Sequence, residues 1–230
     1  MPLFRRTPPP TPPLDPDQWR PQRFGKGGGR TRDSIIEPSW GGVRVLARYD
    51  GSATKLIDDD GVDCTAEFAG IAAAITASAL AGELVLDGFL TVEPTQLGDA
   101  SPIPQDQTPT TGQMMTQFLV GSHVAARMAA TPERQIDPDR PIAFVAVDLL
   151  SIDGSPLLDI PLLERKRLLD GALAPAELVR ITPFVRPPIG SFVATWRGAG
   201  FGALAYKAPN SRYIPDSRND DWSIMPMPPK

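Results

Sequence analysis

The sequence has little of what many catalytic and metal centres need. It contains one cysteine, Cys64, and one histidine, His123, among 230 residues. A single cysteine excludes an intramolecular disulfide. Because no CxxC spacing or histidine partner accompanies it, we expect Cys64 to be a small, partly buried residue. A single histidine gives little support to a histidine-based metal site or to a Ser–His–Asp triad.

Long apolar runs are also missing. No stretch approaches the roughly 18–20 apolar residues of a membrane span, and the first residues are prolines and arginines rather than the apolar core of a signal peptide. We therefore expect a cytoplasmic protein without a membrane partner. The formal charge of −4, with 41% hydrophobic and 22% charged residues, is ordinary for a globular chain and favours one large domain.

Proline, by contrast, is abundant and unevenly placed, with 27 residues in the chain. Residues 1–34 are Pro-rich and then Gly-rich, with few apolar side chains, which predicts a disordered tail. This tail carries seven Lys and Arg residues against three Asp, a formal charge of +4, so the remaining 16 basic and 24 acidic residues give −8. The tail can be a solvated linker, or an arm that binds DNA or a DNA-repair partner.

The stretch from residue 35 to 51, IIEPSWGGVRVLARYDG, predicts a strand, a bend and a second strand. Pro38 and the pair Gly41-Gly42 interrupt the first apolar run. Alternating side chains then follow until the turn signal Asp50-Gly51. This pattern predicts a β-hairpin around a Gly-rich bend.

Apolar spacing predicts two helices. Residues 65–80 form the first, which Thr65 caps and which carries Glu67 in its first turn. Its buried face, at spacing i, i+3, i+4 and i+7, consists of Phe68, Ile71, Ala72 and Ile75. The second runs to about residue 173 and is entered through Pro161, with leucines inward and the basic run 164–167 on a solvated face.

The remaining segments are read from composition. Residues 83–92 and 141–154 predict strands, the second of them buried. Residues 93–113 predict an exposed loop, and residues 114–130 a further helix. The acidic triplet 58–60 predicts a solvated turn rather than a metal site, because adjacent carboxylates on a turn point in different directions.

Residues 37–44, EPSWGGVR, are similar to the nucleotide-binding signature E-P-K-W-D-G-Y/F-R of ATP-dependent DNA ligases. Five further segments resemble that family in the same order: GVDCTAEF, VLDG, FVAVDLLSIDG, LDIPLLERKRLL, and GAGFGALAYK followed by YIPDSRNDDW. The resemblance implies an α+β fold of the ligase and capping-enzyme nucleotidyltransferase type, ATP-grasp-like, with two antiparallel sheets and flanking helices. It covers residues 35–222, between the tail 1–34 and a C-terminal tail 223–230.

The resemblance also implies site residues. In the family a lysine attacks the α-phosphate of ATP and carries AMP, and Ser39 occupies that position here. The other altered family positions are Gly41 (aspartate), Asp59 (ribose arginine), Phe89 and Gly202 (acids), Val147 (adenine-stacking aromatic), and Ile224 and Pro226 (triphosphate lysines). Glu37, Arg44 and Lys207 keep family residues and are nucleotide-binding candidates; the alternative is that they are surface or scaffold polar residues.

Two function hypotheses remain. The first is a catalytically inactive ligase-like accessory protein that binds a nucleotide, DNA or a DNA-repair partner. The second is an active nucleotidyltransferase that uses an unusual nucleophile or a partner subunit. The altered acids and the missing OB-fold favour the first. No catalytic residue, metal site or cofactor is assigned, and ATP and Mg²⁺ act only if family activity persists.

Overall fold

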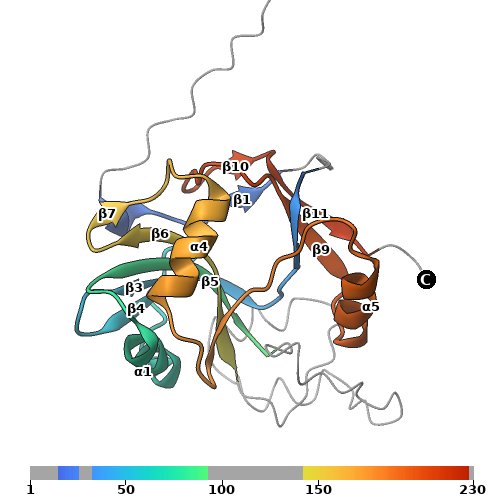
Figure 1. The fold of residues 1–230 in the computed structure, drawn as a ribbon. Coiled ribbons are helices and arrows are strands. Elements are labelled where there is room, and N and C mark those ends of the chain that lie inside the picture. Colours follow the sequence, from blue (N-terminus) through green and yellow to red (C-terminus); the bar gives the residue numbers. More distant parts are fainter. Residues whose placement is uncertain (1–14, 26–32, 93–141, 228–230) are drawn as a thin grey trace, which may run out of the picture.

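The computed structural model describes residues 15–25, 33–92 and 142–227, a mixed α/β arrangement of three sheets (Figure 1). The large sheet has the order β4-β3-β5-β6-β7, and β8 pairs with β6 from outside this path. Its strands are β3 (Val43–Tyr49), β4 (Thr54–Asp58), β5 (Leu84–Thr91), β6 (Ala143–Ile152), β7 (Ser155–Pro156) and β8 (Val179–Ile181). All of its pairings are antiparallel except that of β8 with β6.

Two smaller sheets lie beside the large one. The three-stranded sheet has the antiparallel order β11-β9-β2, and β1 and β10 form a short parallel pair. These strands are β1 (Arg23–Phe24), β2 (Ile35–Pro38), β9 (Ala203–Lys207), β10 (Arg218–Asn219) and β11 (Trp222–Pro226). The helices are the 3₁₀ turn η1 (Pro16–Gln18) and the α-helices α1 (Ala69–Ser78), α4 (Leu162–Ala172) and α5 (Gly190–Gly198).

Strand β6 joins the cores of the molecule. Phe144, Ala146 and Leu149 face the core beneath α1 and α4, whereas Val145 and Val147 face a second core beneath α5. A strand buried on both faces reads as a continuous apolar run, and the prediction of a buried strand at residues 141–154 is confirmed. The strand predicted at residues 83–92 is confirmed as β5.

Helix α1 has the predicted apolar face but a different start. Phe68, Ile71, Ala72 and Ile75 all lie in the core of the large sheet. The helix begins at Ala69, and no side chain caps it. The prediction that Thr65 is the cap is therefore wrong: its hydroxyl oxygen instead accepts a hydrogen bond from the backbone N–H of Leu56, 2.9 Å away.

The predicted hairpin at residues 35–51 is wrong. Strand β2 pairs with β9, about 170 positions along the chain, and β3 pairs with β4 and β5 in the other sheet. The chain crosses between sheets at Gly42, where φ is +99° and a Cβ atom would lie 2.1 Å from the carbonyl oxygen of Leu90. Only glycine fits this crossing. The local hairpin is β3-β4, around the Asp50-Gly51 turn.

The prediction that residues 1–34 form one disordered tail is wrong for residues 15–25. Trp19 is 1% exposed and packs with Ile35, Leu46 and Trp222 in a third core. The backbone N–H of Gly25 donates to the carbonyl oxygen of Trp222 over 2.8 Å, next to the β1-β10 pair. Local proline content predicted a linker, but distant apolar residues stabilise this segment.

Several remaining predictions have plain outcomes. Cys64 is confirmed as buried, and burial, with a further contribution from Asp58, raises the pKa of its thiol to about 12. Helix α5 was not predicted. The loop and helix predicted between residues 93 and 130 lie outside the described residues. Among the helices that the structure describes, none is long and apolar enough to cross a membrane.

Candidate functional site

A pocket of about 180 Å³ lies where the three-stranded sheet meets β3, β5 and β6. Three sheets contribute to its wall, because Phe24 reaches it from β1. Its lining residues are mostly apolar: Phe24, Glu37, Pro38, Ser39, Trp40, Arg44, Phe89, Val147, Ala205, Lys207 and Ile224. The polar side chains among them come from positions that the sequence singled out.

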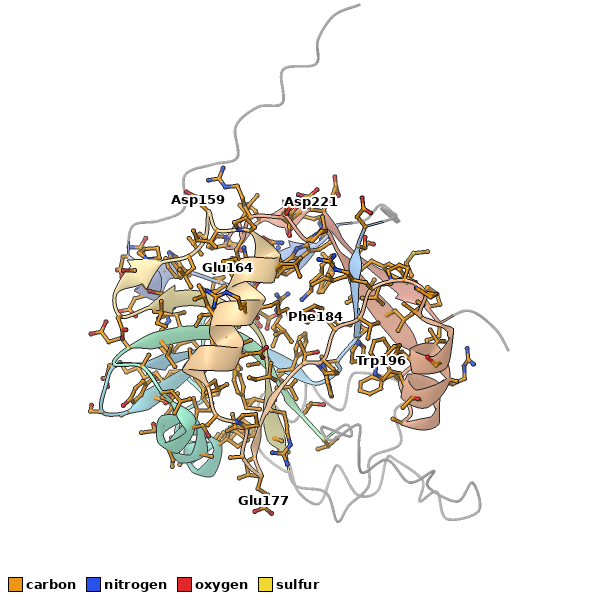
Figure 2. All side chains as sticks on the ribbon, viewed as in Figure 1. Asp159, Glu164, Glu177, Phe184, Trp196 and Asp221 are labelled. Carbon is orange, nitrogen blue, oxygen red and sulfur yellow. The ribbon has the colours of Figure 1, made fainter. Side chains whose placement is uncertain are left out.

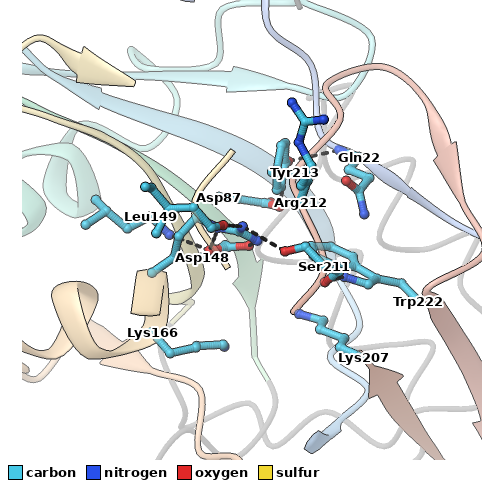
Figure 3. A network of polar contacts seen from close by, with 12 residues as sticks. Gln22, Asp87, Asp148, Leu149, Lys166, Lys207, Ser211, Arg212, Tyr213 and Trp222 are labelled. Carbon is cyan, nitrogen blue, oxygen red and sulfur yellow. Dashed lines mark hydrogen bonds and ion pairs between the residues drawn. The ribbon is translucent and has the colours of Figure 1, made fainter. Parts of the chain in front are cut away.

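Glu37, which lines this pocket, is held between two lysines. One carboxylate oxygen lies 2.6 Å from Lys166 Nζ and the other 2.8 Å from Lys207 Nζ. All three side chains are at most 2% exposed. Figure 3 shows the lysines reaching in from α4 and β9. This buried triad has two cations and one anion.

Lys207 also contacts an aromatic face. Its Nζ lies 4.4 Å from the ring centroid of Trp222, a cation–π contact. Burial lowers the pKa of Lys207, Glu37 partly offsets that effect, and the charge of Lys166 lowers the pKa further. The protonated form of Lys207 therefore lacks full compensation in the described residues around it.

Arg44 is engaged by a carboxylate on the neighbouring strand. Its Nε and one terminal nitrogen donate to the two oxygens of Asp87, over 2.9 and 2.5 Å. Tyr213 donates its hydroxyl to the same carboxylate over 2.8 Å. Burial alone would lower the pKa of Arg44, but the charge and hydrogen bonds of Asp87 raise it above its ordinary value. Burial, and then Asp87, raise the pKa of Tyr213.

Aromatic rings bracket the Arg44 guanidinium. Its central carbon lies 5.7 Å from the ring centroid of Phe24 and 5.7 Å from that of Phe89. Its remaining terminal nitrogen donates to the carbonyl oxygen of Gln22 over 2.5 Å. These contacts and the pair with Asp87 make Arg44 a connection between the N-terminal segment and the large sheet.

A second buried ion pair supports the site from α4. Arg165 donates to both carboxylate oxygens of Asp148, over 2.9 and 2.8 Å, and both side chains are fully buried. The expected solvated basic face at 164–167 is therefore wrong for Arg165 and Lys166. Glu164 does lie on the exposed side of α4 (Figure 2), where Arg167 pairs with it.

The missed residues had a signal in their spacing. Lys166 lies four positions after Leu162 and three before Leu169, so 3.6-residue periodicity places it on the leucine face. The charge of Arg165 and Lys166 led to the prediction that both are exposed to solvent. The partners that make their burial possible, Asp148 and Glu37, lie on strands that are distant in the sequence. Phe24 carried no such local signal.

The structure gathers several predicted site positions and leaves others apart. Ser39 is 7% exposed and lines the pocket together with Phe89, Val147 and Ile224. Glu37, Arg44 and Lys207 line it too. Glu37 and Lys207 are buried, so the alternative of surface residues is wrong for them, whereas the alternative of scaffold residues is not contradicted. Four altered positions do not line it: Gly41, Asp59, Gly202 and Pro226.

The acidic triplet lies in the turn after β4. The carboxylate oxygens of Asp58, Asp59 and Asp60 lie within 4.8 Å of one another. Asp58 Oδ1 accepts hydrogen bonds from the backbone N–H groups of Asp60 and Val62, over 3.0 and 2.8 Å. Asp58 therefore stabilises the turn. The expectation that these carboxylates point in different directions is wrong, and Asp58 is buried rather than solvated.

Comparison with known proteins gives a family match and distant relatives. The family model described as ATP dependent DNA ligase domain matches residues 29–224. A DNA ligase from Natronomonas pharaonis is 26% identical over 189 residues, and DNA ligase 1 from Korarchaeum cryptofilum is 27% identical over 193. The matches cover 82% and 81% of this chain but 31% of each relative. The chain thus spans about a third of the length of these relatives.

Solved structures share the fold. The ligase domain of M. tuberculosis LigD has a TM-score of 0.62 at 23% identity, over 92% of this chain and 60% of that one. A mycobacterial DNA ligase D, solved in complex with ATP and MES, has a TM-score of 0.61 at 22% identity, over 91% of this chain and 60% of its own. At this identity the likeness concerns the arrangement of the elements.

Proposed function

The chain belongs to the ATP-dependent DNA ligase domain family, and from that membership we propose that it is a ligase-like binding domain that does not transfer AMP. It acts as an accessory protein on a nucleotide, on DNA or on a DNA-repair partner. The ligase and capping-enzyme type of frame, with its ATP-grasp-like character, is part of the same proposal and rests on the order of the six sequence segments.

The observation that carries this proposal is Ser39 in the wall of the pocket. The family signature has a lysine there, whose amine can take up AMP as a phosphoramidate. A hydroxyl is shorter than a lysine side chain and needs a base to activate it. Lys207, the one amine among the described residues that line the pocket, is engaged by Glu37.

The pocket residues do not fit Mg²⁺-ATP in the way that the resemblance implies. Phe89 and Gly202 stand where the family has acids, and the carboxylate that lines the pocket, Glu37, is paired with two ammonium groups. Ile224 and Pro226 supply no charge for a triphosphate. Metal and cationic stabilisation are central to phosphoryl chemistry, so we derive no adenylyl-transfer step for this chain.

Incubation of the protein with α-labelled ATP and Mg²⁺ or Mn²⁺, followed by a denaturing gel, tests the proposal. We expect no labelled band. A label that survives acid and disappears in Ser39→Ala would be a serine phosphodiester, and a label lost in acid would be a lysine phosphoramidate; either contradicts the proposal and supports an active nucleotidyltransferase.

Ser39→Lys separates a missing nucleophile from a missing nucleotide site. We expect this variant to remain unlabelled too, since the acids and terminal lysines are still absent. Labelling of Ser39→Lys alone would mean that the pocket still positions ATP and that only the nucleophile is gone.

A further inference from the structure

Among the residues that the structure describes, the ion pairs around the pocket do not balance. Arg165 with Asp148 and Arg44 with Asp87 are each neutral as pairs. Glu37 is shared by Lys166 and Lys207, so the triad, which is at most 2% exposed, carries one positive charge in excess when both lysines are protonated. An unmatched buried charge is costly. The lowered pKa of Lys207 is the expected response to this imbalance.

The triad borders the apolar part of the pocket through Lys207. Lys207 lines the pocket, whereas Lys166 does not. Phe89, Val147 and Ala205 lie in the same wall. A dry cavity of about 150 Å³ holds one benzene ring, and sites for drug-sized ligands occupy about 300–1,000 Å³. At about 180 Å³ the pocket matches a single-ring ligand.

We propose that this pocket binds a small aromatic carboxylate, whose ring packs on the apolar wall and whose carboxylate pairs with Lys207. The proposal goes beyond the function proposed above, which names a nucleotide, DNA or a DNA-repair partner. A monoanion cancels a single surplus charge, whereas a phosphate monoester carries about −1.5 to −2 at pH 7 and would leave negative charge unpaired against the apolar walls.

Titration calorimetry of the whole chain with benzoate tests the charge and the ring together. The comparison ligands are benzamide, which has the ring without the charge, inorganic phosphate, which has charge without the ring, and AMP. We expect benzoate to bind at least about tenfold more tightly than each of the others, the scale of one hydrogen bond to a charged group. Equal binding of benzamide, or tighter binding of AMP or phosphate, would overturn the proposal.

Three variants locate the site. Lys207→Met should lose benzoate binding by about tenfold or more, and Lys55→Met, an exposed lysine on β4, should bind like the wild type. Because Lys207→Met can fail to fold, Phe89→Glu is the second test: it places an anion in the wall of the pocket and should abolish binding. Undiminished binding in Phe89→Glu would refute the site.

The two proposals fail in different ways. A labelled AMP adduct would contradict the non-transferring role whatever benzoate does. Failure of benzoate to bind, with no AMP adduct, would remove the ligand class and leave the non-transferring role in place.

Discussion

Two arginines on α4 differ sharply in burial and therefore in how much their charge contributes to stability. Arg165 and Arg167 lie two positions apart, yet Arg165 is fully buried against Asp148 and Arg167 is 68% exposed beside Glu164. Arg165→Ala leaves Asp148 as an uncompensated buried charge, so we expect a loss of about 3–5 kcal/mol in the free energy of unfolding. Urea denaturation of the variant and the wild type measures it.

Arg167→Ala is the matched control on the same helix. Its ion pair with Glu164 is exposed to solvent and contributes little, and alanine favours the helix, so its unfolding midpoint should stay close to that of the wild type. An equal loss in the free energy of unfolding for both variants would contradict this prediction. It would mean that the buried pair of Arg165 with Asp148 is not what stabilises the packing of α4 on β6.

Secondary-structure elements were predictable where their own spacing defines them. Strand β5, strand β6 and the apolar face of α1 follow from local patterns. Strand β2 was assigned the wrong partner because its real partner, β9, lies far along the chain. The pocket has the same limit. The resemblance named seven of its lining positions one by one, but the Glu37–Lys166–Lys207 triad needs three distant elements.

Residues 15–25 show the largest difference between the sequence-based prediction, a disordered tail, and the structure, in which they are packed. Trp19 packs in the third core, and Phe24 lines the pocket. We expect Trp19→Ala to lower the free energy of unfolding by about 3–5 kcal/mol, because a large buried ring leaves a cavity. Phe192→Ala removes an aromatic ring that is 45% exposed and should cost much less. Urea denaturation distinguishes the two.

Two shortened chains extend this prediction. A chain that starts at Asp15 should keep the stability of the whole protein, and one that starts at Lys26 should lose at least as much as Trp19→Ala. Equal stability of the Lys26 chain and the whole protein would mean that residues 15–25 contribute nothing to the fold.

At the scale of the whole molecule, the basic residues of the N-terminal region that can contact DNA lie outside residues 15–25. Arg23 pairs with Asp216 over 3.0 Å, and Arg20 donates to the carbonyl oxygens of Asp17 and Trp19 within its own segment. The stretches 1–14 and 26–32 contain five basic residues and no acidic ones: Arg5, Arg6, Lys26, Arg30 and Arg32. We therefore propose these five as the DNA contacts of an otherwise acidic chain.

Replacing all five with glutamine should remove DNA binding. Phosphate contacts release counterions, so the wild type should bind duplex DNA without sequence preference and lose affinity with a log–log salt slope no steeper than about −4.5, or −0.9 per contact. The control replaces five exposed basic residues of the domain, Lys55, Arg167, Arg186, Arg212 and Arg218, with the same change in net charge.

Fluorescence anisotropy at low and moderate salt compares the three proteins. The glutamine variant of the two stretches should lose both affinity and slope, while the control keeps the slope. If the control loses binding instead, the DNA-binding face lies on the domain, and a ligase-like cleft becomes the better account of this chain.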